Sequence, residues 1–383
     1  MKRRSFRRRV LLWLTPWLCG GVLGAGAALG LRPPTTRIER QIERSDGVIL
    51  PDPTYARGAD YPWSRQAPPE FPIPPYAEHL RGVRIVLDPG HGGRGDVPGF
   101  KRGPTGLREA EVNLRVAKYL RDFLREAGAS VTLTREDDRY LHKENSADLQ
   151  ARAEVANRAN ADLFLSIHHN AAGSPRANYS AVFYHGDADH SPASLSAARF
   201  FVAGLADALR LESQLPCPVL SDENMYETGF GVLRAANVPA VLTEASFYSN
   251  PDEETRLRDP IYNRREAYGL FVAIARWGYA GLPRVRIIEP AGRWKRGEPI
   301  AVALDDGLRG RGGWGKDRVR IVRDSFSVKV NGEWADFSVD EGMTRLTISP
   351  PETRENELRV RVDFENVFGQ RVLHPEMTLK VSR

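Results

Sequence analysis

The stretch "VLDPGHGG", Val86 to Gly93, decides how the first part of this chain is interpreted. A short apolar run stops at Asp88-Pro89, and a single histidine, His91, follows between glycines. Apolar runs of this length that end in turn residues are typical of buried strands. The pattern therefore predicts a strand and then a tight turn that carries an imidazole over the end of a sheet.

Strand-like and helix-like runs alternate from this stretch to about residue 282. The strand-like runs lie at residues 83–88, 130–135, 162–170, 180–186 and 239–246, and the helix-like runs at 109–128, 146–160, 195–211 and 262–280. Alternation of this kind predicts an α/β fold, with a mainly parallel sheet and helices on both faces. We assign this domain to residues 81–282.

The pattern changes after Arg284, where short runs of alternating apolar and polar residues replace the helices. Asn331-Gly332 stands between two such runs, at the place where a tight hairpin turn is expected. About 100 residues of this kind predict an all-β, immunoglobulin-like sandwich over residues 284–383.

The excess of positive charge lies entirely at the N-terminus. Six of the 55 Lys and Arg residues lie within the first nine positions, and the remaining 49 equal the 49 Asp and Glu residues. A nucleic-acid-binding body would carry basic charge on its own surface, so we do not expect nucleic acid as a partner. Cys217 is the one cysteine beyond the N-terminal segment, so no internal disulfide is expected in the mature chain.

An uncharged run of 22 residues, Val10 to Leu31, follows the basic start. Basic residues before an apolar run are typical of a signal peptide or an uncleaved membrane anchor, which we assign to residues 1–31. Residues 32–80 are rich in proline and predict an extended linker. We therefore expect the body to work outside the cytoplasm, in the periplasm or cell envelope, with membrane contact only through the N-terminal segment.

Three polar residues stand at predicted strand ends: His91, His168 and Glu244. Because parallel strands end at one edge of a sheet, these side chains are expected to meet there, and Glu109 near the start of a helix can point back at the same edge. Two histidines and one carboxylate are a recognised ligand set for catalytic zinc, and a further carboxylate can serve as general base. Glu111 is a rival to Glu109 but is turned away around the helix.

Four motifs in order resemble those of the zinc-dependent N-acetylmuramoyl-L-alanine amidases of the amidase type 3 family of cell-wall hydrolases. They are Asp-Pro-Gly-His-Gly-Gly at 88–93, Gly-x-x-Glu at 106–109 with Leu114, Ser-Ile-His-x-Asn at 166–170, and Glu244 followed by Phe247 and Ser249-Asn250. The resemblance covers about 200 residues and does not reach the linker or the C-terminal domain. The loop "RGDVPGFKRGPT", 94–105, departs from the pattern of the family.

The resemblance implies Zn²⁺ bound by His91, Glu109 and His168, with Glu244 as the catalytic carboxylate. It implies peptidoglycan as substrate, cleaved between N-acetylmuramic acid and the L-alanine of the stem peptide. Two alternatives stay open: another zinc amide hydrolase such as a carboxypeptidase, and a wall-binding module without catalysis. No run between residues 171 and 243 is left over for a helix that plugs the site, and the C-terminal domain is either a spacer or a contact for the wall or a protein partner.

Overall fold

A computed structural model describes residues 71–382, apart from residues 98, 188–189, 212–216 and 309–319. The predicted signal peptide or anchor, the linker up to residue 70 and most of the Gly-rich loop at 305–318 therefore lie outside the described residues. Within the part that is described, no helix combines the length and apolar character that crossing a membrane requires.

The α-helices of the described chain are α2 (Glu109–Glu126), α3 (Asn145–Arg158), α4 (Pro192–Leu209), α5 (Gly231–Arg234), α6 (Pro251–Leu257) and α7 (Pro260–Tyr279). Three short 3-10 helices are η1 (Pro75–Leu80), η2 (Asp222–Asn224) and η3 (Arg323–Ser325). These elements cover most of the helix-like runs that the sequence predicts.

A six-stranded sheet forms the first part of the fold, in the order β2-β1-β3-β6-β4-β5. Its strands are β1 (Arg84–Pro89), β2 (Ser130–Leu133), β3 (Leu163–Asn170), β4 (Ala181–Tyr184), β5 (Val219–Ser221) and β6 (Ala240–Phe247). The pairs β2–β1, β1–β3 and β3–β6 are parallel, as the alternating sequence pattern predicts.

Strand β4 runs antiparallel to β6, with Ala181 opposite Glu244, and β5 is parallel to β4. The sheet is therefore mixed rather than parallel throughout. The short link between β3 and β4, residues 171–180, contains no helix. Because a parallel return needs a crossover of about a dozen residues or more, a link of this length favours the reversed direction of β4.

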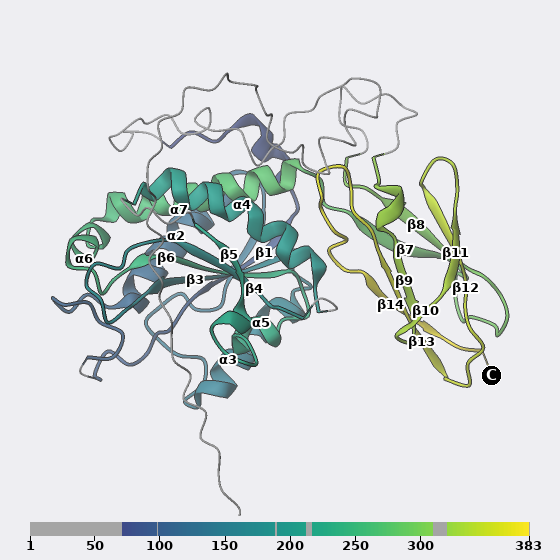
Figure 1. Cartoon of the computed structure of the whole chain (residues 1–383), viewed down its shortest axis with the longest axis horizontal. Helices are drawn as coiled ribbons and strands as arrows, with labels where there is room; N and C mark the ends of the chain where they lie inside the picture. The colour runs from purple at the N-terminus through teal and green to yellow at the C-terminus, as the bar shows by residue number, and fades with distance from the viewer. Residues whose placement is uncertain (1–70, 98, 188–189, 212–216, 309–319, 383) are drawn as a thin grey trace, which may run out of the picture. The chain divides into compact units, whose positions relative to one another are not determined.

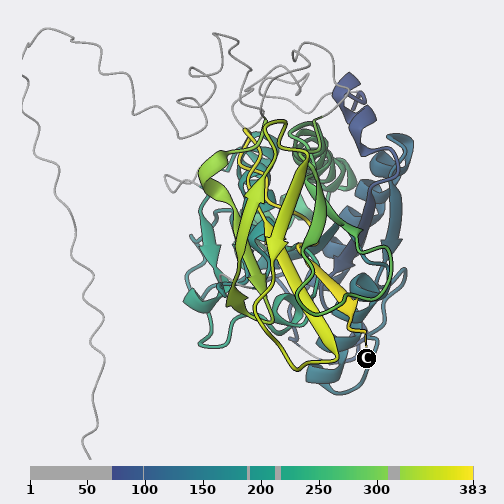
Figure 2. The same ribbon diagram turned by 90° about the vertical axis from the view of Figure 1, so that its right-hand side faces the viewer.

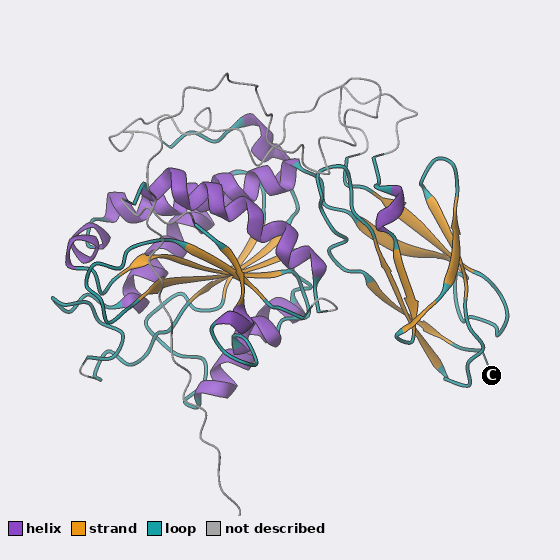
Figure 3. Ribbon diagram, in the orientation of Figure 1, coloured by secondary structure: helices purple, strands orange, loops and turns teal. Residues whose placement is uncertain are grey.

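Helices cover both faces of this sheet (Figure 1). Helices α2, α4 and α7 lie on one face, and α3 and α5 on the other, as labelled in Figure 1 and shown in purple in Figure 3. Successive residues of a strand point to opposite faces. Accordingly, Ile85 and Leu87 of β1 belong to the hydrophobic cluster with α2 and α7, and Val86 belongs to the cluster with α3 and α5.

The described end of the Pro-rich segment packs on α2 and α7. The Phe71 ring lies 6.0 Å from the Phe123 ring and 5.3 Å from the Tyr268 ring, and the Tyr268 hydroxyl donates to the Pro72 carbonyl at 2.6 Å. Leu80 at the end of η1 is fully buried. This stretch therefore covers a helical layer of the fold and leads into the beginning of β1.

Two four-stranded antiparallel sheets follow, in the orders β10-β9-β13-β14 and β11-β12-β8-β7. Their strands, in green to yellow in Figure 2, are β7 (Arg284–Glu289), β8 (Ile300–Asp305), β9 (Ser327–Val330), β10 (Glu333–Trp334), β11 (Asp336–Val339), β12 (Arg345–Ser349), β13 (Glu357–Asp363) and β14 (Glu376–Lys380). Inward residues of both sheets, such as Val302 and Val360, share one buried cluster. The all-β prediction for this part is therefore confirmed.

Candidate metal site

His91 lies in a turn directly after β1, and its own backbone is left-handed with φ of 60°. Such a conformation is uncommon for a residue with a side chain and persists only where its surroundings impose it. Here two buried guanidinium groups hold the carbonyl groups of the turn. Arg152 donates to the His91 carbonyl at 2.7 Å, and Arg135 donates to the Pro89 carbonyl at 2.8 Å and to that of Gly90 at 2.9 Å.

Asp88, near the end of β1, holds one of these guanidinium groups in place. Its carboxylate accepts from Arg152 at 2.9 Å, from the Thr134 hydroxyl at 2.6 Å and from the Ser166 hydroxyl at 2.8 Å. Burial by itself raises the pKa of Asp88, but Arg152 and the two hydroxyl groups outweigh it and hold the pKa below its ordinary value. The ionised carboxylate therefore ties the strand end to its neighbours.

Gly90 leaves room for His168, which lies near the end of β3. A Cβ atom built on Gly90 would overlap the imidazole ring of His168. Any larger residue at position 90 would displace that ring, so the glycine permits the close approach of β1 and β3 side chains at this edge.

Glu109 is the first residue of α2, and its carboxylate lies between two imidazoles. Glu109 Oε2 is 3.1 Å from His91 Nε2, and Glu109 Oε1 is 3.1 Å from His168 Nδ1. The two imidazole rings stand edge to face, with centroids 4.8 Å apart. One ligand atom from each of the three residues lies within 4.8 Å of the others.

The carboxylate of Glu109 is buried but incompletely bonded. Its side chain is 1% exposed, and Oε2 faces only the His91 imidazole, at 3.1 Å and without a well-aligned hydrogen bond. Burial raises the pKa of Glu109, yet His91 and His168 outweigh burial and keep the pKa well below its ordinary value. Two imidazoles and an ionised carboxylate with a spare oxygen are suitable donors for a divalent cation, so the residues present fit a metal ion.

Glu244 of β6 lies beside this group, because it is the register partner of His168 on the neighbouring parallel strand. Its Oε2 atom is buried and has no hydrogen-bond partner. Burial and the nearby charge of Glu109 raise the pKa of Glu244 well above its ordinary value. A carboxyl group with this pKa and no fixed partner is suited to accept and release a proton.

The structure thus brings His91, Glu109, His168 and Glu244 to one edge of the sheet. Glu111, the rival to Glu109, has a side chain that is 49% exposed and lies 3.6 Å from Arg108. His91 and His168 keep 24% and 15% of their side chains exposed, so the group is open to solvent.

Sequence reasoning missed a buried network behind Glu109. His169 bonds Asn113 at 2.8 Å through Nδ1 and Glu266 of α7 at 3.0 Å through Nε2. Asn113 in turn donates to Glu109 Oε1 at 3.2 Å, and the His169 backbone N–H donates to the same oxygen at 3.2 Å. Burial lowers the pKa of His169, but Glu266 outweighs it and raises the pKa.

Asn113 was within reach of sequence reasoning, because it stands four residues after Glu109 on one helix face. Glu266 was not, since it lies 97 residues beyond His169 and no local pattern connects the two.

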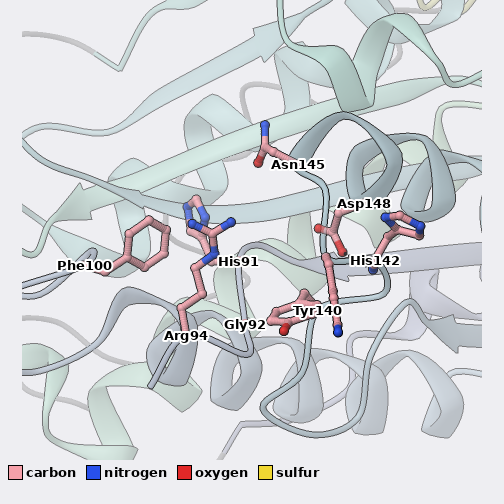
Figure 4. A pocket seen from close by; sticks show the side chains of 9 residues that line it. His91, Gly92, Arg94, Phe100, Tyr140, His142, Asn145 and Asp148 are labelled. Atoms are coloured by element: carbon pink, nitrogen blue, oxygen red, sulfur yellow. Dashed lines mark hydrogen bonds between the residues drawn. The ribbon is translucent and has the colours of Figure 1, made fainter. Parts of the chain in front are cut away.

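A pocket opens next to His91, between the loop after β1 and the loop before α3. Figure 4 shows Phe100 and Arg94 beside His91, with Tyr140, His142 and Asp148 on the other side of the pocket. The remaining lining residues are Gly92, Lys143 and Asn145. The pocket therefore extends the candidate metal site toward a surface that carries several basic side chains.

The family model Amidase_3, described as N-acetylmuramoyl-L-alanine amidase, matches residues 85–276, which are half of the chain. The chain belongs to this family. The resemblance inferred from the four sequence motifs is thereby confirmed. All four residues at the sheet edge lie within the matched segment of this amidase family, and residues 277–383 lie beyond it.

The curated relatives of this amidase-family chain include the probable cell wall amidase LytH of Staphylococcus aureus. It is 34% identical over 185 residues, which are 48% of this chain and 55% of that protein. The chain therefore matches little more than half the length of these relatives.

Solved structures with likeness to the chain include the catalytic domain of CwlV, an N-acetylmuramoyl-L-alanine amidase from Bacillus (Paenibacillus) polymyxa var. colistinus. It has 29% identity and a TM-score of 0.43, and the match covers 51% of this chain and 97% of that one. The amidase AmiC2 of Nostoc punctiforme has 27% identity and a TM-score of 0.42, with 51% and 96% covered.

Proposed function

We propose that the chain is a zinc-dependent N-acetylmuramoyl-L-alanine amidase that acts on peptidoglycan outside the cytoplasm. Family membership supports the reaction class. The observation that carries the proposal is the convergence of His91, Glu109 and His168 beside Glu244. The catalytic domain would span residues 81–282, and an immunoglobulin-like domain residues 284–383.

His91, Glu109 and His168 are the residues that would hold Zn²⁺. When bound, the ion supplies a Lewis acid that polarises the amide carbonyl and acidifies water. The buried carboxylate of Glu109 and the two imidazoles that lie 3.1 Å from its oxygens support this assignment. Three ligands from the protein leave a position for substrate or water, as a catalytic zinc site requires.

Glu244 would act as the general base. Its carboxylate accepts a proton from the water that attacks the carbonyl carbon of the lactyl group. The C–N bond to L-alanine then breaks, and Glu244 returns the proton to the leaving amine. The products are the free lactyl carboxylate of the sugar and the amino group of the stem peptide, so atoms and charges balance.

The carboxypeptidase alternative is disfavoured by the origin of the ligands. Many zinc carboxypeptidases take two ligands from one His-x-x-Glu segment, whereas here Gly92, Gly93 and Arg94 follow His91. A wall-binding module without catalysis would lack a ligand or the base, and all four residues are present. The C-terminal sheets remain candidates for contact with the wall or with a protein partner.

The test is digestion of purified peptidoglycan by the full-length chain, with fragments identified by mass. We expect stem peptides with a free L-alanine amino group, no release after treatment with a chelator, and recovery when zinc is restored. Cleavage at another bond would overturn the proposed specificity, and full activity in chelator would overturn the role of the metal.

A further inference from the structure

The pocket beside His91 has a basic lining that the hydrolysis itself does not use. Arg94, His142 and Lys143 line it together with the aromatic side chains of Phe100 and Tyr140 (Figure 4). Because His91 is both a candidate metal ligand and part of the wall, a substrate held at the metal site can extend directly into this pocket.

The only acidic residue in the lining is already neutralised. Asp148 accepts from the backbone N–H groups of Leu141 and His142 at 2.6 and 3.0 Å and from Arg152 at 2.7 Å. Asp148 therefore compensates Arg152 and positions the loop, and it does not cancel the charges of the pocket.

The basic side chains keep their donors for a ligand. The described contacts give neither Arg94 nor Lys143 an ion pair, and the Arg94 guanidinium lies over the Phe100 ring at 5.1 Å from its centroid. His142 Nδ1 accepts from the Glu144 backbone at 3.1 Å, which leaves Nε2 as a donor. The stacking on Phe100, whose ring stands edge-on to His91 at 6.4 Å, holds a positive charge close to the candidate metal site.

The size of the pocket limits the group that it can take. Its cavity volume is about 40 Å³. Since one water needs roughly 10 to 15 Å³ by the same measure, the pocket suits a group of about three heavy atoms. A carboxylate has this size, and a sugar ring is several times larger.

We propose that this pocket is a carboxylate subsite for the stem peptide, in which Arg94 and Lys143 bind the free α-carboxylate of the residue after L-alanine. The inference rests on the proposed amidase function. Two extended residues span about 7 Å, so this carboxylate lies one short peptide step from the scissile amide. A preference for peptides with a free carboxylate over peptides amidated at this position follows.

The experiment uses two synthetic muramoyl dipeptides that differ only at the second residue, D-isoglutamate or D-isoglutamine, each with its γ-carboxyl blocked as the methylamide. We expect the zinc-loaded chain to cleave the isoglutamate compound with a kcat/KM about tenfold higher than that for the isoglutamine compound. A difference of this size corresponds to one charge-assisted contact. The double variant Arg94→Gln with Lys143→Gln should lose this preference. Its kcat/KM should fall for the isoglutamate compound and stay unchanged for the isoglutamine compound. Lys118→Gln on α2 removes a charge outside the pocket and should keep the preference.

Equal kcat/KM for the two dipeptides in the unaltered chain would overturn the subsite, as would a preference that survives in the double variant. A longer peptide that carries a free carboxylate only at its third residue shows which residue provides the recognised group. If the chain prefers only that peptide, the assignment to the second residue is overturned.

If neither muramoyl dipeptide is cleaved, the pocket is judged by binding, and the proposed function fails only if peptidoglycan is left intact as well. Calorimetric titration with L-Ala-D-isoglutamate and L-Ala-D-isoglutamine then decides: tighter binding of the first, lost in the double variant, supports the pocket. Equal binding, or none, overturns it. Zinc content measured on each variant shows whether a change arises from the pocket or from a lost metal ion.

Discussion

Two clusters of histidine and carboxylate lie beside the first sheet, and their imidazole pairs have similar geometry. His91 and His168 have ring centroids 4.8 Å apart at 90° around Glu109, and His185 and His190 have centroids 4.8 Å apart at 83° near Asp222. Both carboxylates are buried. Residue types and spacing therefore do not distinguish them.

The hydrogen bonds of the two carboxylates distinguish the two clusters. Asp222 accepts from the backbone of Gly186 at 3.1 Å and of Phe230 at 2.8 Å, besides His185 at 3.1 Å. His190 bonds the Leu233 carbonyl through Nε2 at 3.1 Å. Glu109 Oε2, by contrast, is buried, accepts no backbone N–H group and faces only His91 Nε2 at 3.1 Å. A satisfied cluster stabilises loops, whereas an unsatisfied and convergent one has bonding capacity left for a ligand.

The two clusters also lie at opposite ends of the strands. Strand β4 is antiparallel to β6, so its end at Tyr184 lies beside the beginning of β6, while Glu244 lies nearer the end of β6. The reversal of β4 thus separates the Asp222 cluster from the edge at which the candidate metal ligands meet.

The largest effect should come from Glu109→Ala. Loss of this ligand is expected to remove zinc and to slow amide hydrolysis by about 1,000-fold or more, since a bound metal supplies several kcal/mol to the transition state. Zinc per chain and release of stem peptides are the measurements. The matched change in the other cluster, Asp222→Ala, should retain zinc, and equal metal loss in both would break the comparison.

Glu244→Gln should have the second largest effect, a loss of about 100- to 10,000-fold in turnover, as expected for removal of a general base. The amide keeps the shape of the side chain but cannot accept the proton, so zinc content should not change. Turnover near that of the unaltered chain would exclude Glu244 from the mechanism.

Glu266→Gln tests the network behind Glu109. A weaker hold on His169 should loosen the orientation of Glu109 through Asn113 and weaken zinc binding roughly 10- to 100-fold, as with other partners of metal ligands. Competition with a chelator of known affinity measures this.

The control is Glu253→Gln, which changes an equally buried carboxylate bonded to Tyr262 and Asn178. It should lower thermal stability without weakening zinc binding. A similar loss of zinc affinity in both variants would assign the effect of Glu266 to stability alone.

The smallest effect on activity should come from Asp222→Asn. The amide can accept from only one of the two backbone N–H groups, so we expect the free energy of unfolding to fall by about 1 to 3 kcal/mol. Urea unfolding measures this loss, while zinc content and turnover stay unchanged. A lower turnover without loss of stability would give the Asp222 cluster a functional role.

Much of the fold followed from periodicity, because buried strands and amphipathic helices leave local patterns. The direction of β4 did not, since nothing within "SAVFYHG" encodes whether its neighbour is parallel. Its cause is the short connection before Ala181, which cannot hold a crossover helix.

The candidate site was partly predictable for the same reason. His168 and Glu244 lie near the ends of strands whose sequences predict burial, and Glu109 belongs to the Gly-x-x-Glu motif. Their mutual distances depend on strand order and on Gly90, which no single-sequence pattern supplies. The network through Glu266 joins side chains whose proximity arises only when α7 packs on the sheet, and the roles of all these residues remain predictions.

The ion pair between Asp88 and Arg152 has a consequence for ionic strength. Both side chains are at most 2% exposed, so dissolved ions cannot come between them, whereas charges at a surface are screened over about 8 Å in physiological salt. The turn that carries His91 therefore keeps its shape as salt rises, while Arg94 and Lys143 attract an anionic peptide less. If the proposed amidase function and carboxylate subsite hold, salt would raise KM for such peptides and leave kcat nearly constant, so the ionic surroundings would alter which peptides are selected without altering how they are cleaved.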